Sequence, residues 1–134
     1  MHLTTTALTA AALAVLLVFL SVATIRMRMK HGAAYGDGGQ HGLTCAIRAH
    51  GNLTEYAPMG IILIGLLELS GASHPALAIT AAAFVVARVL NAWGLFSPPG
   101  PPRPARSIGI VATLAILLGL PIWLVVILHM SGEA

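Results

Sequence analysis

Four long apolar runs dominate the pattern of the chain, and polar residues gather between them. The runs cover about residues 3–25, 43–69, 76–96 and 106–130. An α-helix needs about 20 residues to cross a hydrocarbon core about 30 Å thick, and each run is near or above that length. The pattern predicts an all-α fold, an integral membrane four-helix bundle that forms a single domain over residues 1–134.

The segments between the runs predict the topology. Residues 26–42 are rich in glycine and are expected to form a loop, and residues 70–75 are expected to form a short turn. Every Lys and Arg falls within residues 26–48 or 88–106. With four spans these two windows lie on the same side. The positive-inside rule then places both windows in the cytoplasm and both termini on the non-cytoplasmic side.

Composition supports a membrane protein and excludes several other classes. Only 8% of the residues are charged, whereas soluble domains carry about 25%. The sequence pI of about 9.8 does not indicate a nucleic-acid partner, because no basic patch is interleaved with aromatic residues. The single cysteine, Cys45, excludes an internal disulfide, and the six histidines lack metal-ligand spacing. We therefore expect no metal site.

A polar stripe lies at the entrance of the second apolar run. Arg48, Asn52, Glu55 and Tyr56 are spaced i, i+4, i+7 and i+8, which places them on one face of an α-helix. Charged side chains inside a membrane are costly unless they face protein or a water-filled cleft. The stripe is therefore a candidate functional site.

The predicted cytoplasmic ends of the other three helices add further polar residues, namely Arg26, Arg88, Asn91, Arg106 and Ser107. Arginine forms paired hydrogen bonds with carboxylates, and a glutamate can bind an ammonium group. A cation at the start of a helix also favours an anion such as a thiolate. This set suits a zwitterionic ligand with excess negative charge.

Simpler interpretations of the same residues remain open. Arg48 and Arg88 could be interfacial arginines that only set topology, and Glu55 could form a structural ion pair with either of them. Arg106 could anchor the fourth span. A small four-helix cation exporter is a less favoured alternative, because such proteins typically carry a carboxylate in the first span and residues 3–25 contain none.

The stripe also carries a family resemblance. Arg48-Ala49-His50-Gly51-Asn52, followed by Glu55-Tyr56 and Pro58, resembles the signature of the MAPEG family, the membrane-associated proteins in eicosanoid and glutathione metabolism. The resemblance extends to Arg26-Met27-Arg28 after the first run and to residues 103–107 before the fourth. The loop at residues 34–39 resembles that of bacterial members.

The resemblance implies a multi-pass protein of the bacterial inner membrane and a homotrimer in contact with lipid. Glutathione, as co-substrate, would bind between neighbouring subunits near the cytoplasmic face and attack a lipophilic electrophile or hydroperoxide. The implied glutathione-binding residues are Arg26, Arg48, Asn52, Glu55, Tyr56, Arg88 and Asn91. The implied catalytic residues are Arg106, which would stabilise the thiolate, and its neighbour Ser107.

The chain departs from this pattern at two positions. Asn91 and Leu95 stand where the eicosanoid enzymes of the family have a tyrosine or histidine and a tyrosine. A family member with a structural or regulatory role instead of catalysis is therefore kept as an alternative. The resemblance implies a glutathione S-transferase, but transferase, peroxidase and isomerase activities use the same thiolate and stay open.

Overall fold

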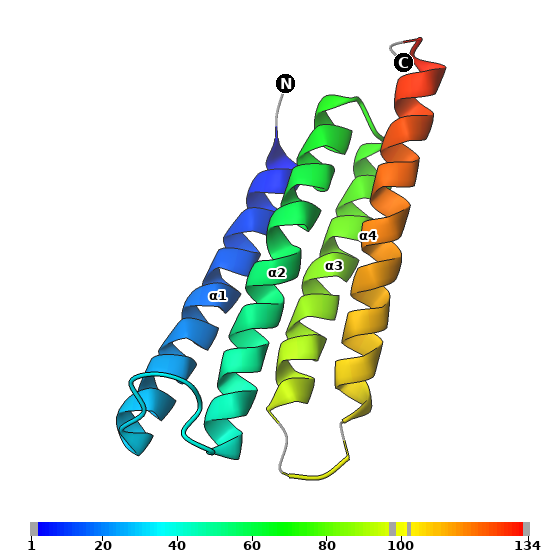
Figure 1. Cartoon of the computed structure of the whole chain (residues 1–134). Coiled ribbons are helices and arrows are strands. Elements are labelled where there is room, and N and C mark those ends of the chain that lie inside the picture. The colour runs from blue at the N-terminus through cyan, green and yellow to red at the C-terminus, as the bar shows by residue number, and fades with distance from the viewer. Residues whose placement is uncertain (1–2, 97–98, 102, 133–134) are drawn as a thin grey trace.

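The computed structural model describes residues 3–96, 99–101 and 103–132. Its helices stand side by side and run alternately up and down (Figure 1). They are α1 (Thr4–His31), α2 (His41–Leu69), α3 (His74–Leu95) and α4 (Pro104–Met130). The prediction of an all-α four-helix bundle is confirmed.

Three of these helices, α1, α3 and α4, are long and apolar enough to cross a membrane. In α2, which has 29 residues, the polar stripe occupies part of the first half and lowers the hydropathy. The helix nevertheless continues through Pro58 to Leu69. A membrane helix tolerates an internal proline when neighbouring helices and polar groups satisfy the freed backbone groups.

Helix α1 is longer than the apolar run predicted. It continues past residue 25 to His31, so Arg26 and Arg28 lie on the helix and not in a loop. The basic residues of the last turn explain the extension, because cations are favourable at the negative end of the helix dipole. Gly32, whose φ is 61°, then ends the helix in the left-handed conformation. The loop shortens to residues 32–40.

The two middle helices hold the bundle together. Helices α2 and α3 contact each other, and both contact α1 and α4, whereas α1 and α4 make no contact across the described residues. The core is largely apolar. Phe84 of α3 packs against Gly60 of α2 so closely that a side chain at Gly60 would clash with the ring. Because α1 and α4 contact the same two helices but not each other, the side of the bundle where α1 meets α3, called the edge between them, lies opposite the edge between α2 and α4.

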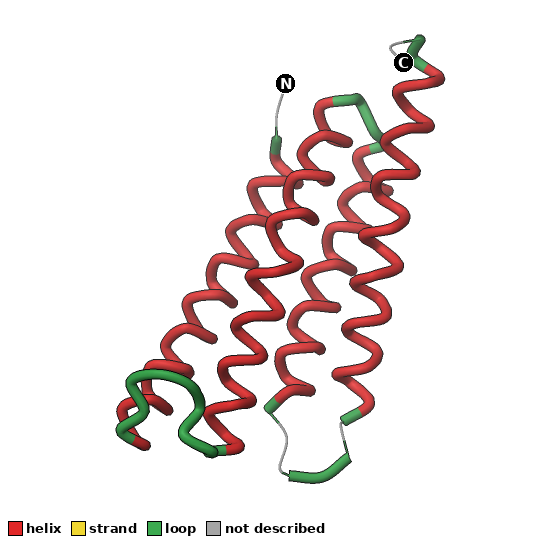
Figure 2. The backbone as a smooth tube through the Cα atoms, viewed as in Figure 1, coloured by secondary structure: helices red, strands yellow, loops and turns green. Residues whose placement is uncertain are grey.

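The connections alternate between the two ends of the bundle (Figure 2). Helix α1 begins and α4 ends at the same end as the short turn between α2 and α3. Residues 32–40 and 99–101 lie at the other end, which we call the basic end because the Lys and Arg residues lie toward it. Placement of the basic end in the cytoplasm stays a prediction.

Candidate functional site

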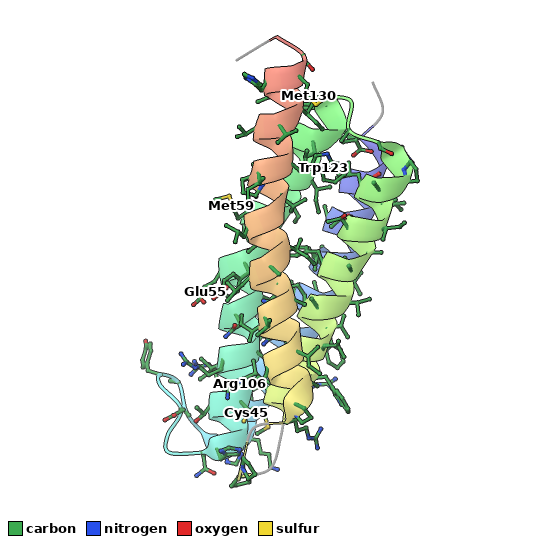
Figure 3. All side chains as sticks on the ribbon, turned by 90° about the vertical axis from the view of Figure 1, so that its right-hand side faces the viewer. Cys45, Glu55, Met59, Arg106, Trp123 and Met130 are labelled. Atoms are coloured by element: carbon green, nitrogen blue, oxygen red, sulfur yellow. The ribbon has the colours of Figure 1, made fainter. Side chains whose placement is uncertain are left out.

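The polar stripe of α2 lies on the outside of the bundle. One face of the helix is buried through residues such as Ala49, Leu53 and Ala57. Arg48 and Glu55 on another face are exposed, and Asn52 is half-buried between them. Figure 3 shows Glu55 and Met59 projecting away from the helices beside α4. In the described part of the chain the Glu55 side chain has no hydrogen bond or ion pair, so the alternative of a structural ion pair with Arg48 or Arg88 is not formed.

Arg88 is buried beneath this stripe and ties α3 to α2. Its side chain is 1% exposed, and its Nη1 donates a hydrogen bond of 3.1 Å to the carbonyl oxygen of Asn52. Its guanidinium carbon lies 5.1 Å from the centre of the Tyr56 ring, a cation–π distance. The Nε and Nη2 atoms have no partner among the described residues. A buried cation with unused donors is costly unless an anion or water completes its hydrogen bonds.

Asn91 is engaged in the contact between α3 and α4. Its side chain is 3% exposed, and its Nδ2 donates a hydrogen bond of 3.2 Å to the carbonyl oxygen of Arg106. The Asn91 amide therefore positions the first turn of α4. The family resemblance had instead implied that Asn91 contacts glutathione.

Two glycines bring the backbones of α3 and α4 together beside this bond. A side chain at Gly94 would clash with the backbone of Arg106, and one at Gly109 would come within 2.6 Å of the Ala87 carbonyl oxygen. The close approach fixes the start of α4, where Arg106 and Ser107 are exposed. Arg106 thus lies at a closely packed helix start, toward the basic end of the bundle (Figure 3).

The loop of residues 32–40 folds around two charged side chains. The Nη1 of Arg28 donates to the carbonyl oxygens of Ala33, Ala34 and Gly36 at 3.0–3.2 Å. Asp37 accepts hydrogen bonds from the Thr44 hydroxyl at 2.7 Å and from the Gly39 amide at 3.0 Å. These two bonds lower the pKa of Asp37 below its ordinary value.

Of the carboxylates of Asp37 and Glu55, this arrangement leaves one for a ligand. Asp37 is already used inside the loop, whereas Glu55 is exposed on the stripe. The loop thus lowers the number of negative groups that compete with an anionic ligand for the nearby arginines.

The structure also reveals a role that the sequence analysis missed. Glu68, near the far end of α2, accepts hydrogen bonds from the backbone amides of Thr5 and Thr6, both at 2.8 Å, and from the Thr6 hydroxyl at 2.6 Å. It caps the start of α1 in the way that an N-cap side chain would. No local signal could have predicted this contact, because the partners are more than 60 residues apart.

Arg26 and Arg106 are not brought together within one chain. Arg26 is exposed on α1 and Arg106 is exposed on α4, and these two helices do not contact each other. One chain therefore unites the stripe with Arg88. It places Arg106 on α4 and Arg26 on α1, which contact α2 from different sides.

The fold and its polar face define an integral membrane helical bundle with a candidate site on α2. The chain belongs to the MAPEG family, whose model matches residues 6–126. It is 38% identical over 81 residues to inner membrane protein YecN of Escherichia coli, in both strain K12 and strain CFT073. That match covers 60% of this chain and 62% of YecN. No solved structure matches the chain at a significant level.

Proposed function

We propose that this protein is a glutathione S-transferase of the bacterial inner membrane. Glutathione would bind at the basic end, between neighbouring subunits of a homotrimer. Family membership supports the choice of ligand, and the name of YecN supports the inner membrane. The basic end would lie in the cytoplasm by the positive-inside rule.

The observation that carries the proposal is the exposed polar stripe on α2. Arg48 and Glu55 have no partner within the described chain, although they lie on a helix of a membrane bundle. Charged groups there require a protein surface, water or a ligand. The α-carboxylate and ammonium of the γ-glutamyl group and the glycine carboxylate of glutathione complement two arginines and one glutamate.

Arg88 supports the same ligand from beneath the stripe. Its unpartnered Nε and Nη2 donors lie next to Asn52 and Tyr56. An anionic group that reached them would complete hydrogen bonds that the chain alone leaves unmade, which favours binding of an anion over a neutral ligand.

The arrangement of the helices favours a site shared between subunits. Arg26 cannot join Arg106 within one chain, because α1 and α4 lie on opposite sides of the bundle. When a neighbouring copy packs against the α2 stripe, its α1 can bring a second Arg26 to the ligand. Such a contact also removes the charged stripe from lipid.

The chemistry would use the start of α4. Arg106 and the amides of the first helical turn favour a thiolate over a thiol, so the thiol proton passes to water. Ser107 could donate a hydrogen bond to the same sulfur. The thiolate then forms a bond to an electrophilic carbon of a lipophilic substrate, and the leaving group departs with its electron pair. The substrate would reach the sulfur from the bilayer.

A second candidate function is a binding role without catalysis. Asn91 favours it, because its amide already donates a hydrogen bond to the Arg106 carbonyl oxygen and so has a structural role between α3 and α4. This candidate predicts glutathione or another anion at the stripe without a stabilised thiolate.

Calorimetry on the detergent-purified protein tests the proposal. Wild type should bind glutathione, and Glu55→Ala should weaken binding at least tenfold because the ammonium loses its partner. His74→Ala, an exposed substitution at the opposite end, is the matched control and should bind like wild type. A folded wild type that binds no glutathione at millimolar concentration would contradict the proposal.

A further inference from the structure

A second feature of the basic end is an apolar groove between α1 and α3. It has a volume of about 450 Å³ and is lined by Leu16, Phe19 and Ala23 on one side and by Val89, Trp93 and Phe96 on the other. On each side the first and last of these residues are seven positions apart, which corresponds to about 10 Å along the helix axis. Phe19 and Trp93 are 68% and 58% exposed, so the groove opens outward.

The groove has a cationic mouth. The guanidinium of Arg103 lies 5.4 Å from the centre of the Trp93 ring and so sits directly beside the lining. On α1, Arg26 and Lys30 follow Phe19 and Ala23 by seven residues, which places them on the same helix face two turns nearer the basic end. Both side chains are exposed.

We propose that this groove binds one acyl chain of an anionic phospholipid, with its phosphate at Arg103. The apolar lining matches a hydrocarbon chain, and the cations at the mouth match a phosphate at the depth of the headgroups. Tryptophan and arginine are favoured at that depth, where one end of the side chain is apolar and the other is polar. A volume of about 450 Å³ also lies within the usual range of ligand clefts, about 300–1,000 Å³.

Within one chain the groove and the α2 stripe lie on different edges of the bundle, and Arg26 at the groove mouth is the residue that the proposed glutathione site would take from a neighbouring copy. The edge between α1 and α3 is opposite the edge between α2 and α4, which carries the stripe and Arg106. A lipid in the groove therefore leaves the α2 stripe open. The lipid proposal does not depend on glutathione binding, and it would still stand if the protein bound no glutathione.

Quenching of Trp93 fluorescence by brominated lipid tests the proposal in nanodiscs. The chain has two tryptophans, so Trp123→Phe leaves Trp93 as the reporter. Lipid brominated along the acyl chain should quench Trp93 more strongly when its headgroup is phosphatidylglycerol than when it is phosphatidylcholine. Arg103→Gln should lower this preference on the order of fivefold, the usual contribution of one cation near a lipid surface.

Two further variants separate a groove from a merely basic surface. Ala23→Phe should fill the groove and reduce quenching by the anionic lipid. Ala82→Phe is the control, because Ala82 lines a different groove, near the other end of α3, and the substitution should leave quenching unchanged.

Two results would overturn the proposal. Equal quenching by both lipids, unchanged in Arg103→Gln, would mean that Trp93 meets only bulk lipid. The second result is that brominated lipid does not quench Trp93, while the Trp93 emission changes with the protein-to-lipid ratio. This would mean that a second copy of the chain covers the groove.

Discussion

Arg88 is the largest fully buried side chain of the bundle, and it faces a carbonyl oxygen and an aromatic ring. Two of its nitrogen atoms lack partners in the described chain. A residue placed there only for stability would normally have its donors satisfied. We therefore interpret Arg88 as a residue whose two unpartnered nitrogen atoms bind an anionic ligand.

Replacing Arg88 distinguishes a role in ligand binding from a role in stability. Arg88→Met should keep the free energy of unfolding within roughly 2 kcal/mol of wild type, because removing an incompletely paired charge offsets the lost contacts. The same variant should weaken glutathione binding at least tenfold. Thermal unfolding and calorimetry on the same sample measure both. A large loss of stability with unchanged binding would make Arg88 structural.

At the scale of elements, the contact between α3 and α4 decides where Arg106 stands. Gly94 and Gly109 let the two backbones approach closely, and the Asn91 amide bonds across the same contact. Packing this tight leaves no space for an added methyl group without a shift of one helix. The start of α4 is therefore fixed by residues of α3 that need not touch a ligand.

Gly94→Ala should displace the first turn of α4. We expect a loss of about 1–3 kcal/mol of stability, typical of overpacking, together with weaker stabilisation of the thiolate. Gly119→Ala is the matched control, because nothing lies within 4 Å of an added methyl group there and the variant should be neutral or slightly stabilising. Urea or thermal unfolding compares the two. Equal effects at both positions would refute the close approach.

The sequence predicted the parts of this structure that follow from periodicity along one helix. The spacing of Arg48, Asn52 and Glu55 placed them on one face, and apolar length predicted the helices. Contacts between helices had no such signal. From its position on α3 the Asn91 side chain could reach either a ligand or the backbone of α4, and the sequence did not distinguish these. The hydrogen bond that Glu68 accepts from the start of α1 joins parts of the chain that are far apart in sequence.

At the scale of the whole molecule, the proposed glutathione site requires a neighbouring copy of the chain. The separation of α1 from α4 leaves Arg26 and Arg106 in different places, and symmetric packing of identical chains can reunite them. The oligomer would then be part of the site and not only a means of stabilising the bundle.

Mixed oligomers test the shared site. Arg26→Ala chains and Arg106→Ala chains, each defective alone, should regain part of the activity when they are co-expressed, because some interfaces combine an intact Arg26 with an intact Arg106. Transferase turnover in separately purified and co-expressed samples is the measurement. No recovery in a mixed oligomer would show that each chain builds its own site.

The most direct test of the account is the ultraviolet absorbance of the glutathione thiolate on the protein at neutral pH, with binding measured in parallel. Wild type should bind glutathione and show the thiolate signal. Arg106→Ala should still bind through Arg48 and Glu55, but it should lose the signal because the cation that lowers the thiol pKa is gone. An unchanged thiolate signal in Arg106→Ala, or no glutathione binding by folded wild type, would contradict the account.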